Sequence, residues 1–267
     1  MAKTDRELAF VRDLDINESW TRRFTDLIDK HVGFKDAENI LYINAGTGDH
    51  CIAIREKVDE KTVMFATCEN AELLHIARDK GAAVRAGIEF SDDDLDDDSF
   101  DSVLVDASFN RSTELNDLIV EAIRVARPGG DVAVVLPSAG SFGEVFSLLW
   151  EVLFNEELSE HGAAVETMIA DIPTISKVEE FAEKAGLLDV KTESATEIFE
   201  YENGVAFVGS PLVSDFLMPV WLEMLDEETA ENVTQKLAEL IDQEDGDLTF
   251  RFSVKVTLIT GKKERSH

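Results

Sequence analysis

The stretch Asn39-Ile-Leu-Tyr-Ile-Asn-Ala-Gly-Thr-Gly48 joins an apolar strand to a glycine-rich turn. Residues 39–44 are nearly all apolar, which is typical of a short strand buried on both faces of a parallel sheet. Gly46 and Gly48 have no Cβ, so backbone N–H groups in this turn can approach a ligand closely. A helix after the turn would add its positive N-terminal end. The stretch therefore predicts a ligand-binding turn in an open α/β sheet, with a plain tight turn as the alternative.

Further apolar strands follow and alternate with helices. Strands are predicted at residues 62–67, 82–88, 101–106 and 131–136, and helices at residues 72–80 and 113–127. Another helix is predicted to begin at a capping box formed by Ser176 and Glu179 and to end at Gly186. Strands that alternate with helices in this way predict a parallel sheet with right-handed crossovers.

The last part of the chain has a different pattern. Residues 188–201 predict a long strand, and residues 251–260 alternate between apolar and polar side chains, which indicates an antiparallel final strand. Apolar helical stretches at 143–160 and 204–244 are inserted around these strands. We therefore expect an α/β fold with a Rossmann-like, seven-stranded, mostly parallel sheet, an antiparallel last strand, helices on both faces, and helical insertions after strands 5 and 6.

The same patterns predict a single domain over residues 1–267. We expect an N-terminal helical lid at 1–36 and a core at 37–203 that carries a helical insertion at 139–174. A second insertion would cover 204–248, and the last strand and tail 249–267. Chain inserted near the carboxyl ends of such a sheet covers the ligand site, so the apolar insertions predict either an apolar substrate pocket or simply additional core.

The chain is strongly acidic. Its 56 aspartates and glutamates outnumber 25 lysines and arginines, which gives a formal net charge of −31. Such a surface repels phosphate backbones and acidic membranes, so neither a nucleic acid nor a membrane is an expected partner. Six aspartates between Ser91 and Ser99 predict a solvated loop. The acidity indicates a highly solvated surface, with adaptation to a salt-rich cytoplasm as one explanation.

Two cysteines, Cys51 and Cys68, are present, and neither has the spacing of a zinc site, so no metal is expected. A disulfide is not expected in a reducing compartment. The chain has no run of about 18 apolar residues. Its first residues lack the apolar core of a secretory signal, which favours a cytoplasmic protein.

Four segments carry a family resemblance, and they are Ile40-Leu-Tyr-Ile-Asn-Ala-Gly-Thr-Gly48, Thr67-Cys-Glu-Asn-Ala-Glu-Leu-Leu-His-Ile-Ala-Arg78, Asp98-Ser-Phe-Asp-Ser-Val-Leu-Val-Asp106 and Ala122-Ile-Arg-Val-Ala-Arg-Pro-Gly-Gly-Asp-Val-Ala-Val-Val-Leu-Pro137. In them the chain resembles the class I S-adenosylmethionine-dependent methyltransferases, close to the methyltransferase type 11 group. The Ser-Phe-Asp before one strand and the Arg-Pro-Gly-Gly before the next are together quite specific. The resemblance covers residues 37–140 well and implies S-adenosylmethionine as the cofactor.

The resemblance also implies which residues hold that cofactor. The glycine turn would cradle it, and an acid at the end of the second strand would take the ribose hydroxyls. An acid after the third strand would lie near the adenine amine, and the end of the fourth strand would line the pocket near the sulfonium. The implied cofactor-binding residues are Asn44, Ala45, Gly46, Thr47, Gly48, Cys68, Glu69, Glu89, Phe90, Asp106 and Ala107.

Three positions depart from the family pattern. Tyr42 replaces an acid, Asn44 replaces the first glycine, and Cys68 stands where the ribose-binding acid is usual. Asparagine adopts left-handed backbone angles more readily than most residues, so Asn44 is compatible with the turn. A small shift in register would bring Glu69 to the ribose; alternatively, Glu69 is only an acid favoured by the helix dipole.

The leading hypothesis is methyl transfer from S-adenosylmethionine to a small, partly apolar molecule. This displacement needs alignment and desolvation more than acid–base groups, so the lack of a catalytic triad is compatible with it. Asp106 and His50 are the candidates for a general base, although a lone histidine is more often structural.

Two alternatives stay open. The changes at Tyr42, Asn44 and Cys68 are typical of a degenerate methyltransferase fold that serves as an interaction module. A nicotinamide-dependent oxidoreductase is the less favoured alternative, because Cys51 occupies the position of a third glycine and no Tyr-x-x-x-Lys pair is present. The sequence leaves the acceptor and the oligomeric state open.

Overall fold

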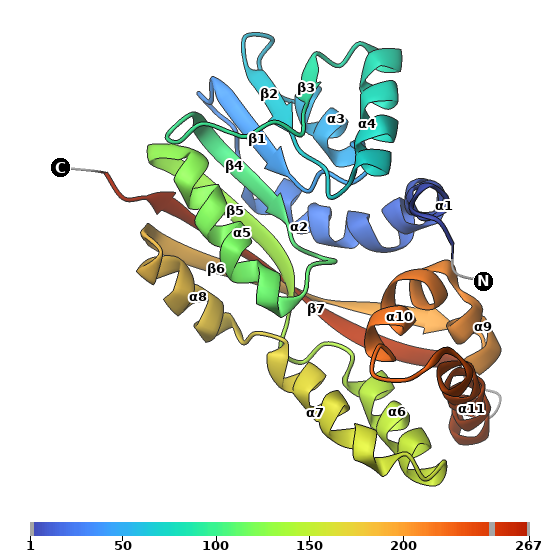
Figure 1. Ribbon diagram of the computed structural model, residues 1–267. Helices are drawn as coiled ribbons and strands as arrows, with labels where there is room; N and C mark the ends of the chain where they lie inside the picture. Colours follow the sequence, from blue (N-terminus) through green and yellow to red (C-terminus); the bar gives the residue numbers. More distant parts are fainter. Residues whose placement is uncertain (1–2, 246–248, 266–267) are drawn as a thin grey trace. The chain divides into compact units, whose positions relative to one another are not determined.

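A computed structural model describes residues 3–245 and 249–265 of the chain. Its centre is a seven-stranded sheet with the order β3-β2-β1-β4-β5-β7-β6 (Figure 1). The strands are β1 (Asn39–Ile43), β2 (Val63–Ala66), β3 (Ile88–Phe90), β4 (Phe100–Asp106), β5 (Ala126–Ser138), β6 (Leu187–Tyr201) and β7 (Phe250–Lys263). The first five of these strands pair in parallel.

The last strand, β7, is antiparallel to its neighbours. Near its end, the Glu264 backbone N–H donates to the Gly186 carbonyl at the start of β6, and Lys263 Nζ donates to the Ala126 carbonyl at the start of β5. The end of β7 thus meets the beginnings of both neighbours. The predicted Rossmann-like, mostly parallel sheet with an antiparallel last strand is confirmed.

The chain divides into two compact units. The first comprises Met1–Pro137, Thr174–Ala195 and Val256–His267, and the second comprises Ser138–Pro173 and Thr196–Lys255. The helices of the first unit are α1 (Asp5–Val11), the π-helix η1 (Arg12–Thr21), α2 (Arg22–His31), α3 (Asp49–Arg55), α4 (Ala71–Val84), α5 (Ser112–Val125) and α8 (Ile175–Lys184).

The first unit contains the glycine turn and two buried faces of the sheet. One face packs against α5 and α8, through side chains such as Val103, Ile119 and Val178 (Figure 1). Side chains alternate along a strand, so Tyr42 and Asp106 belong to the opposite face. Tyr42 contacts His50 of α3 there, which shows that this helix covers the second face.

The second unit consists of helices packed on the ends of three strands. Its helices are α6 (Gly143–Asn155), η2 (Ser159–His161), α7 (Gly162–Asp171), α9 (Gly204–Gly209), the π-helix η3 (Leu212–Leu217), α10 (Met218–Trp221) and α11 (Glu227–Asp245). An aromatic cluster forms its core, in which the Phe142 and Phe146 rings each contact Trp221 at about 5.5 Å or less. The apolar stretches of this part of the sequence therefore bury one another.

Two predictions from the sequence were wrong. Residues 82–84 continue helix α4, because alanines 82 and 83 favour a helix and Arg85 ends it with a φ of 53°. Strand β3 therefore starts only at Ile88. Helix α8 does not use the Ser176–Glu179 capping box. Thr174 caps it instead, and its hydroxyl accepts a hydrogen bond from the Lys177 N–H at 3.2 Å.

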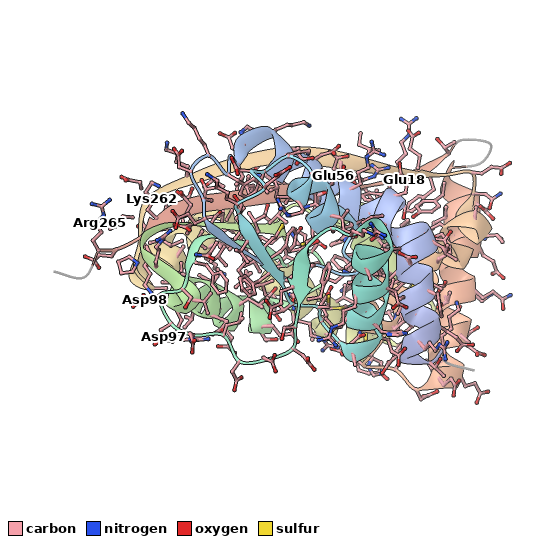
Figure 2. The ribbon with its side chains drawn as sticks, turned by 90° about the horizontal axis from the view of Figure 1, so that it is seen from above. Glu18, Glu56, Asp97, Asp98, Lys262 and Arg265 are labelled. Atoms are coloured by element: carbon pink, nitrogen blue, oxygen red, sulfur yellow. The ribbon has the colours of Figure 1, made fainter. Side chains whose placement is uncertain are left out.

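Many of the acidic side chains project from the surface. Figure 2 shows Glu18, Glu56 and Asp97 pointing away from the ribbon, and the 91–99 stretch is the irregular segment that its aspartates predict. Within residues 3–245 and 249–265, no helix is both long enough and apolar enough to span a membrane. The predicted region boundaries at residues 1, 248 and 267 lie outside the described residues.

Candidate functional site

The turn after β1 has the left-handed backbone that its sequence requires. Asn44, Gly46 and Gly48 have φ values of 60°, 58° and 85°. The prediction that Asn44 tolerates this conformation is confirmed. A Cβ at Gly48 would lie 3.1 Å from both the Ala77 Cβ and the Phe90 Cζ. Glycine is therefore required at position 48 by both its backbone angle and its neighbours.

Asn44 links the turn to the end of β4. Its side-chain amide donates to the Asp106 carbonyl at 3.2 Å and to the Asn110 Oδ1 at 3.0 Å. The residue is 8% exposed. A glycine at this position could form neither contact, so the departure from the family pattern at Asn44 gives the turn an additional tertiary anchor.

Glu69 lies against the same turn. Its Oε2 accepts a hydrogen bond from the Gly46 N–H at 3.1 Å, and the preceding residue, Cys68, is half-buried. Burial, with a contribution from the Glu69 charge, raises the pKa of the Cys68 thiol to about 12, so the thiol is neutral at physiological pH. Glu69, rather than Cys68, is therefore the anionic group at this point of the sheet.

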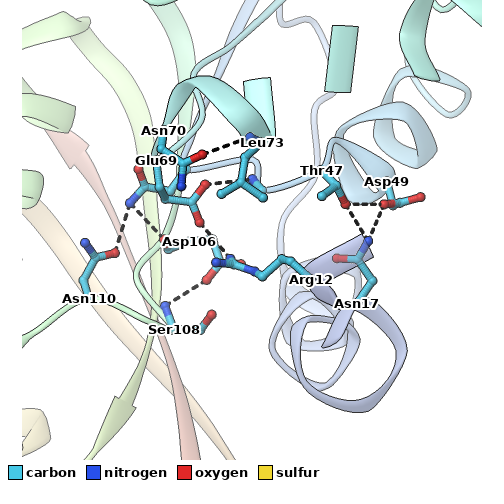
Figure 3. Close-up of polar contacts among 12 residues, drawn as sticks. Arg12, Asn17, Thr47, Asp49, Glu69, Asn70, Leu73, Asp106, Ser108 and Asn110 are labelled. Carbon is cyan, nitrogen blue, oxygen red and sulfur yellow. Dashed lines mark hydrogen bonds and ion pairs between the residues drawn. The ribbon is translucent and has the colours of Figure 1, made fainter. Parts of the chain in front are cut away.

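An arginine from the N-terminal helices reaches this acid. Arg12 Nη2 lies 2.7 Å from Glu69 Oε1, and the Arg12 side chain is 7% exposed (Figure 3). The guanidinium carbon lies 4.2 Å from the centroid of the Phe109 ring, in the segment after β4. Arg12 thus bridges the segments that follow β2 and β4.

Other polar contacts join the π-helix η1 to the turn and to α4. Asn17 Nδ2 donates to Thr47 Oγ1 at 2.6 Å and to Asp49 Oδ2 at 2.5 Å. Lys80 Nζ lies 2.6 Å from Asp49 Oδ2 and also pairs with Asp13. The N-terminal segment is therefore bound directly to the glycine turn, the element that the sequence identifies as the ligand site.

Asp106 is a buried carboxyl group at the end of β4. It is 4% exposed, and its Oδ1 accepts a hydrogen bond from the Ser108 N–H at 2.8 Å. Burial raises the pKa of Asp106 to about 6, although the Ser108 hydrogen bonds oppose the rise. A carboxyl group with a pKa near neutrality can exchange a proton under physiological conditions, as a general base must.

His50 has a partner inside the fold. The Tyr42 hydroxyl and His50 Nδ1 are 3.0 Å apart, and His50 Nε2 lies 3.5 Å from Asp29 Oδ1. Burial lowers the pKa of His50, which favours the neutral ring in its hydrogen bond with the Tyr42 hydroxyl. Tyr42, which replaces the family acid, and His50 therefore connect the two sides of the glycine turn.

The remaining predicted residues lie around the turn in different ways. Phe90 is buried against Gly48 and Gly81, so its ring packs directly against the glycine turn. Glu89 is exposed in a surface hollow that Arg78 and Arg85 also line. Ala107 packs into the α5 face of the core. The structure thus brings Asn44, Gly46, Glu69 and Asp106 together by direct contacts, whereas Glu89 lies at that separate hollow.

The residues around the turn fit an S-adenosyl cofactor. Arg12 Nε is buried and has no hydrogen-bond partner among the described residues. Buried polar groups are normally paired, so this atom indicates a polar ligand. At Gly46 the backbone is open to a ligand because no side chain covers it. The Glu69 and Asp106 carboxyl groups supply hydrogen-bond acceptors for a ribose and negative charge for a sulfonium.

Sequence reasoning missed Arg12, Asn17 and Lys80. One signal was available for Arg12. From α1 to the start of α2, the described buried residues Ala9, Arg12, Ile16, Trp20 and Phe24 recur at helical spacing, and Arg12 is the charged one among them. A charge on an apolar helical face requires a partner, and here the partner is 57 residues away.

Solved structures share this architecture and define its class. The YcgJ protein from Bacillus subtilis superposes with a TM-score of 0.59 at 14% identity, over 92% of this chain and 100% of its own. The Haemonchus contortus phosphoethanolamine N-methyltransferase 2, solved with S-adenosylhomocysteine, superposes with a TM-score of 0.56 at 13% identity, over 98% of this chain and 59% of its own. The fold is that of class I methyltransferases.

The sequence matches a narrower group. The chain belongs to the ubiE/COQ5 methyltransferase family, whose model matches residues 7–199. Demethylmenaquinone methyltransferase from Shouchella clausii is 24% identical over 202 residues, covering 70% of this chain and 84% of the relative. Its counterpart from Thermus thermophilus is 29% identical over 155 residues, covering 55% and 66%.

Proposed function

We propose that the protein transfers a methyl group from S-adenosylmethionine to a small, partly apolar molecule. The observation that carries the proposal is the contact between the Gly46 N–H and Glu69, which brings an acid at the end of β2 against the glycine turn. The carboxylate that the altered motif lacks at Cys68 is thereby supplied by its neighbour. Family membership supports the same chemistry.

The chain's own residues have distinct tasks in this proposal. Glu69 accepts hydrogen bonds from the ribose hydroxyls, and the turn at Gly46 and Thr47 lets the methionine part approach the backbone. When bound, S-adenosylmethionine supplies an electrophilic methyl group on a sulfonium sulfur. Asp106 takes the proton that the methylated molecule loses, because burial raises its pKa to about 6, close to physiological pH. Because both matched relatives are named for demethylmenaquinone, that molecule is the first acceptor to test.

Calorimetric titration with S-adenosylhomocysteine tests the cofactor site. We expect binding in the micromolar range and a loss of roughly tenfold or more in Glu69→Gln, because a hydrogen bond to a charged group contributes about 1.5–3 kcal/mol. Glu56→Gln, on an exposed helix end, is the control and should bind like the unaltered protein. Equal affinity in all three proteins would contradict the role of Glu69.

The ion pair between Arg12 and Glu69 favours a second candidate function. If Arg12 neutralises the site permanently, the fold serves as an interaction module that has no cofactor. Absence of any binding at millimolar S-adenosylhomocysteine and S-adenosylmethionine would support this alternative and contradict the proposed methyltransferase activity.

A further inference from the structure

We propose that Arg12 is an internal competitor for the cofactor, and that residues 5–15 act as a gate that leaves Glu69 before the ribose binds there. The inference rests on the proposed function, because it assumes that Glu69 is the ribose acid. It adds a step that controls access to the site and assigns that step to one side chain. We call residues 5–15 the N-terminal gate.

Arg12 occupies the space in which the turn and two strand ends converge. It pairs with Glu69 at 2.7 Å, its guanidinium lies over Phe109 at 4.2 Å, and Nη2 is 3.6 Å from the place of a Cβ on Gly46. A ligand that approaches the Gly46 backbone and the Glu69 carboxylate needs the same volume. Arg12 and such a ligand therefore exclude one another.

Both Glu69 oxygens are already engaged when the gate is closed. Oε1 accepts from Arg12 and Oε2 accepts from the Gly46 N–H. The ion pair also cancels one of the two negative charges, Glu69 and Asp106, that would attract a sulfonium cation. Opening the gate frees an acceptor atom and restores that charge, so binding and opening are thermodynamically linked.

The gate has few contacts that resist opening. Among its described residues, Ala9 is the only fully buried apolar side chain, whereas Phe10 and Leu14 are 47% and 76% exposed. Farther along the chain, Ile16 and Trp20 are buried completely and anchor the next turns. Burial contributes most of the stability of such helices, so the part before Ile16 is held mainly by polar contacts.

Those polar contacts are imperfect. Arg12 Nε is buried without a partner among the described residues, which makes the closed state less favourable than a fully paired one. Lys80 is shared between Asp13 and Asp49, so it keeps an acidic partner when the Asp13 contact is lost. The segment from Arg12 is also a π-helix, a rare form that is frequent at functional sites. The closed gate is therefore stable enough to form and weak enough to open.

Arg12→Gln provides the decisive test, with Arg22→Gln as the matched control. Arg22 lies in α2, where its side chain forms an exposed ion pair with Glu18. If the closed state predominates tenfold, Arg12→Gln binds S-adenosylhomocysteine about tenfold more tightly than the unaltered protein, because the apparent dissociation constant scales inversely with the open fraction. Asp13→Asn, which loosens the gate without altering the crevice, should shift affinity in the same direction.

Hydrogen exchange supplies a readout without catalysis. Amides of residues 5–15 should exchange faster in Arg12→Gln, and faster in the unaltered protein after S-adenosylhomocysteine is added. Arg22→Gln should change neither affinity nor exchange. Weaker or unchanged binding in Arg12→Gln, or slower exchange of residues 5–15 on ligand addition, would overturn the gate while leaving the proposed function intact. Absence of binding in every variant would instead reject the proposed function and the gate with it.

Discussion

Asp106 shows how a single buried carboxyl group couples the site to pH. Its pKa is raised from 3.8 to about 6, chiefly by burial. In the unfolded chain this group ionises as the pH passes about 4, whereas in the folded protein it keeps its proton until about pH 6. The unfolded state therefore releases its proton first, and the contribution of Asp106 to stability is lost as the pH rises through this window.

Asp106→Asn should remove this pH dependence. We expect the free energy of unfolding of the variant, relative to the unaltered protein, to rise by up to about 3 kcal/mol between pH 4 and pH 7.5, since each pKa unit corresponds to about 1.4 kcal/mol. Urea denaturation at both pH values measures the difference. Asp94→Asn, in the exposed acidic loop, is the control. A difference that does not change with pH would show that Asp106 ionises normally.

The residue scale also shows which substitutions in the first motif are compensated. Asn44 adopts the left-handed angle of the glycine it replaces and adds two hydrogen bonds. Tyr42 exchanges a carboxylate for a hydroxyl that contacts His50. These side chains keep the turn in place through neutral hydrogen bonds, so the negative charge of the site is supplied by Glu69 and Asp106.

At the scale of elements, the glycine turn depends on the helices and strand beside it. Strand β3 places Phe90 below Gly48, and the same ring lies 2.9 Å from the place of a Cβ on Gly81 of α4. The Phe90 ring therefore fills the space that side chains at positions 48 and 81 would occupy. This packing explains why a residue without a side chain stands at position 81, inside α4, where the sequence predicts a helix end.

Gly48→Ala should disturb the turn through this packing. The alanine would have to adopt a φ of 85°, and its Cβ would lie 3.1 Å from the Ala77 Cβ and from the Phe90 Cζ. We expect a loss of about 1–3 kcal/mol in the free energy of unfolding, typical of a residue forced into such a conformation, and weaker binding of S-adenosylhomocysteine. Gly33→Ala has no atom within 4 Å of its Cβ and is the control. Equal losses in the two variants would refute the explanation.

At the scale of the whole molecule, the charge of −31 is the dominant property. Acidic side chains such as Glu18 and Glu56 point outward (Figure 2). Like charges at such density repel one another and destabilise the compact state. The basic residues offset only part of this repulsion, through surface ion pairs such as Lys262 with Asp131. Each such pair contributes little to the free energy of unfolding.

Added salt should therefore stabilise the protein. We expect the urea midpoint to rise between 0.1 M and 1 M KCl, as the screening length falls from about 10 Å to about 3 Å. An uncharged osmolyte at equal osmolality separates charge screening from the exclusion of solute from the protein surface. A midpoint that does not respond to KCl would remove salt adaptation as the explanation of the acidity.

The sequence by itself determined the order of strands and helices, the antiparallel last strand and the position of the glycine turn. These features depend on the spacing of apolar residues and on glycine and proline between them, which are local properties of a chain. The left-handed angle of Asn44 was predictable for the same reason. The end of α4 was not, because a glycine favours a helix end, whereas in the fold the helix continues to Val84 and Gly81 packs against Phe90 of β3.

Only the tertiary structure decided how the site is closed and charged. Glu69 rather than Cys68 faces the turn, because the strand end and the Gly46 amide set its direction. Arg12 reaches Glu69 across 57 positions of sequence, and Asn44 reaches Asp106 across 62. The geometry of such contacts depends on how distant elements pack, and no periodic pattern within either segment encodes it.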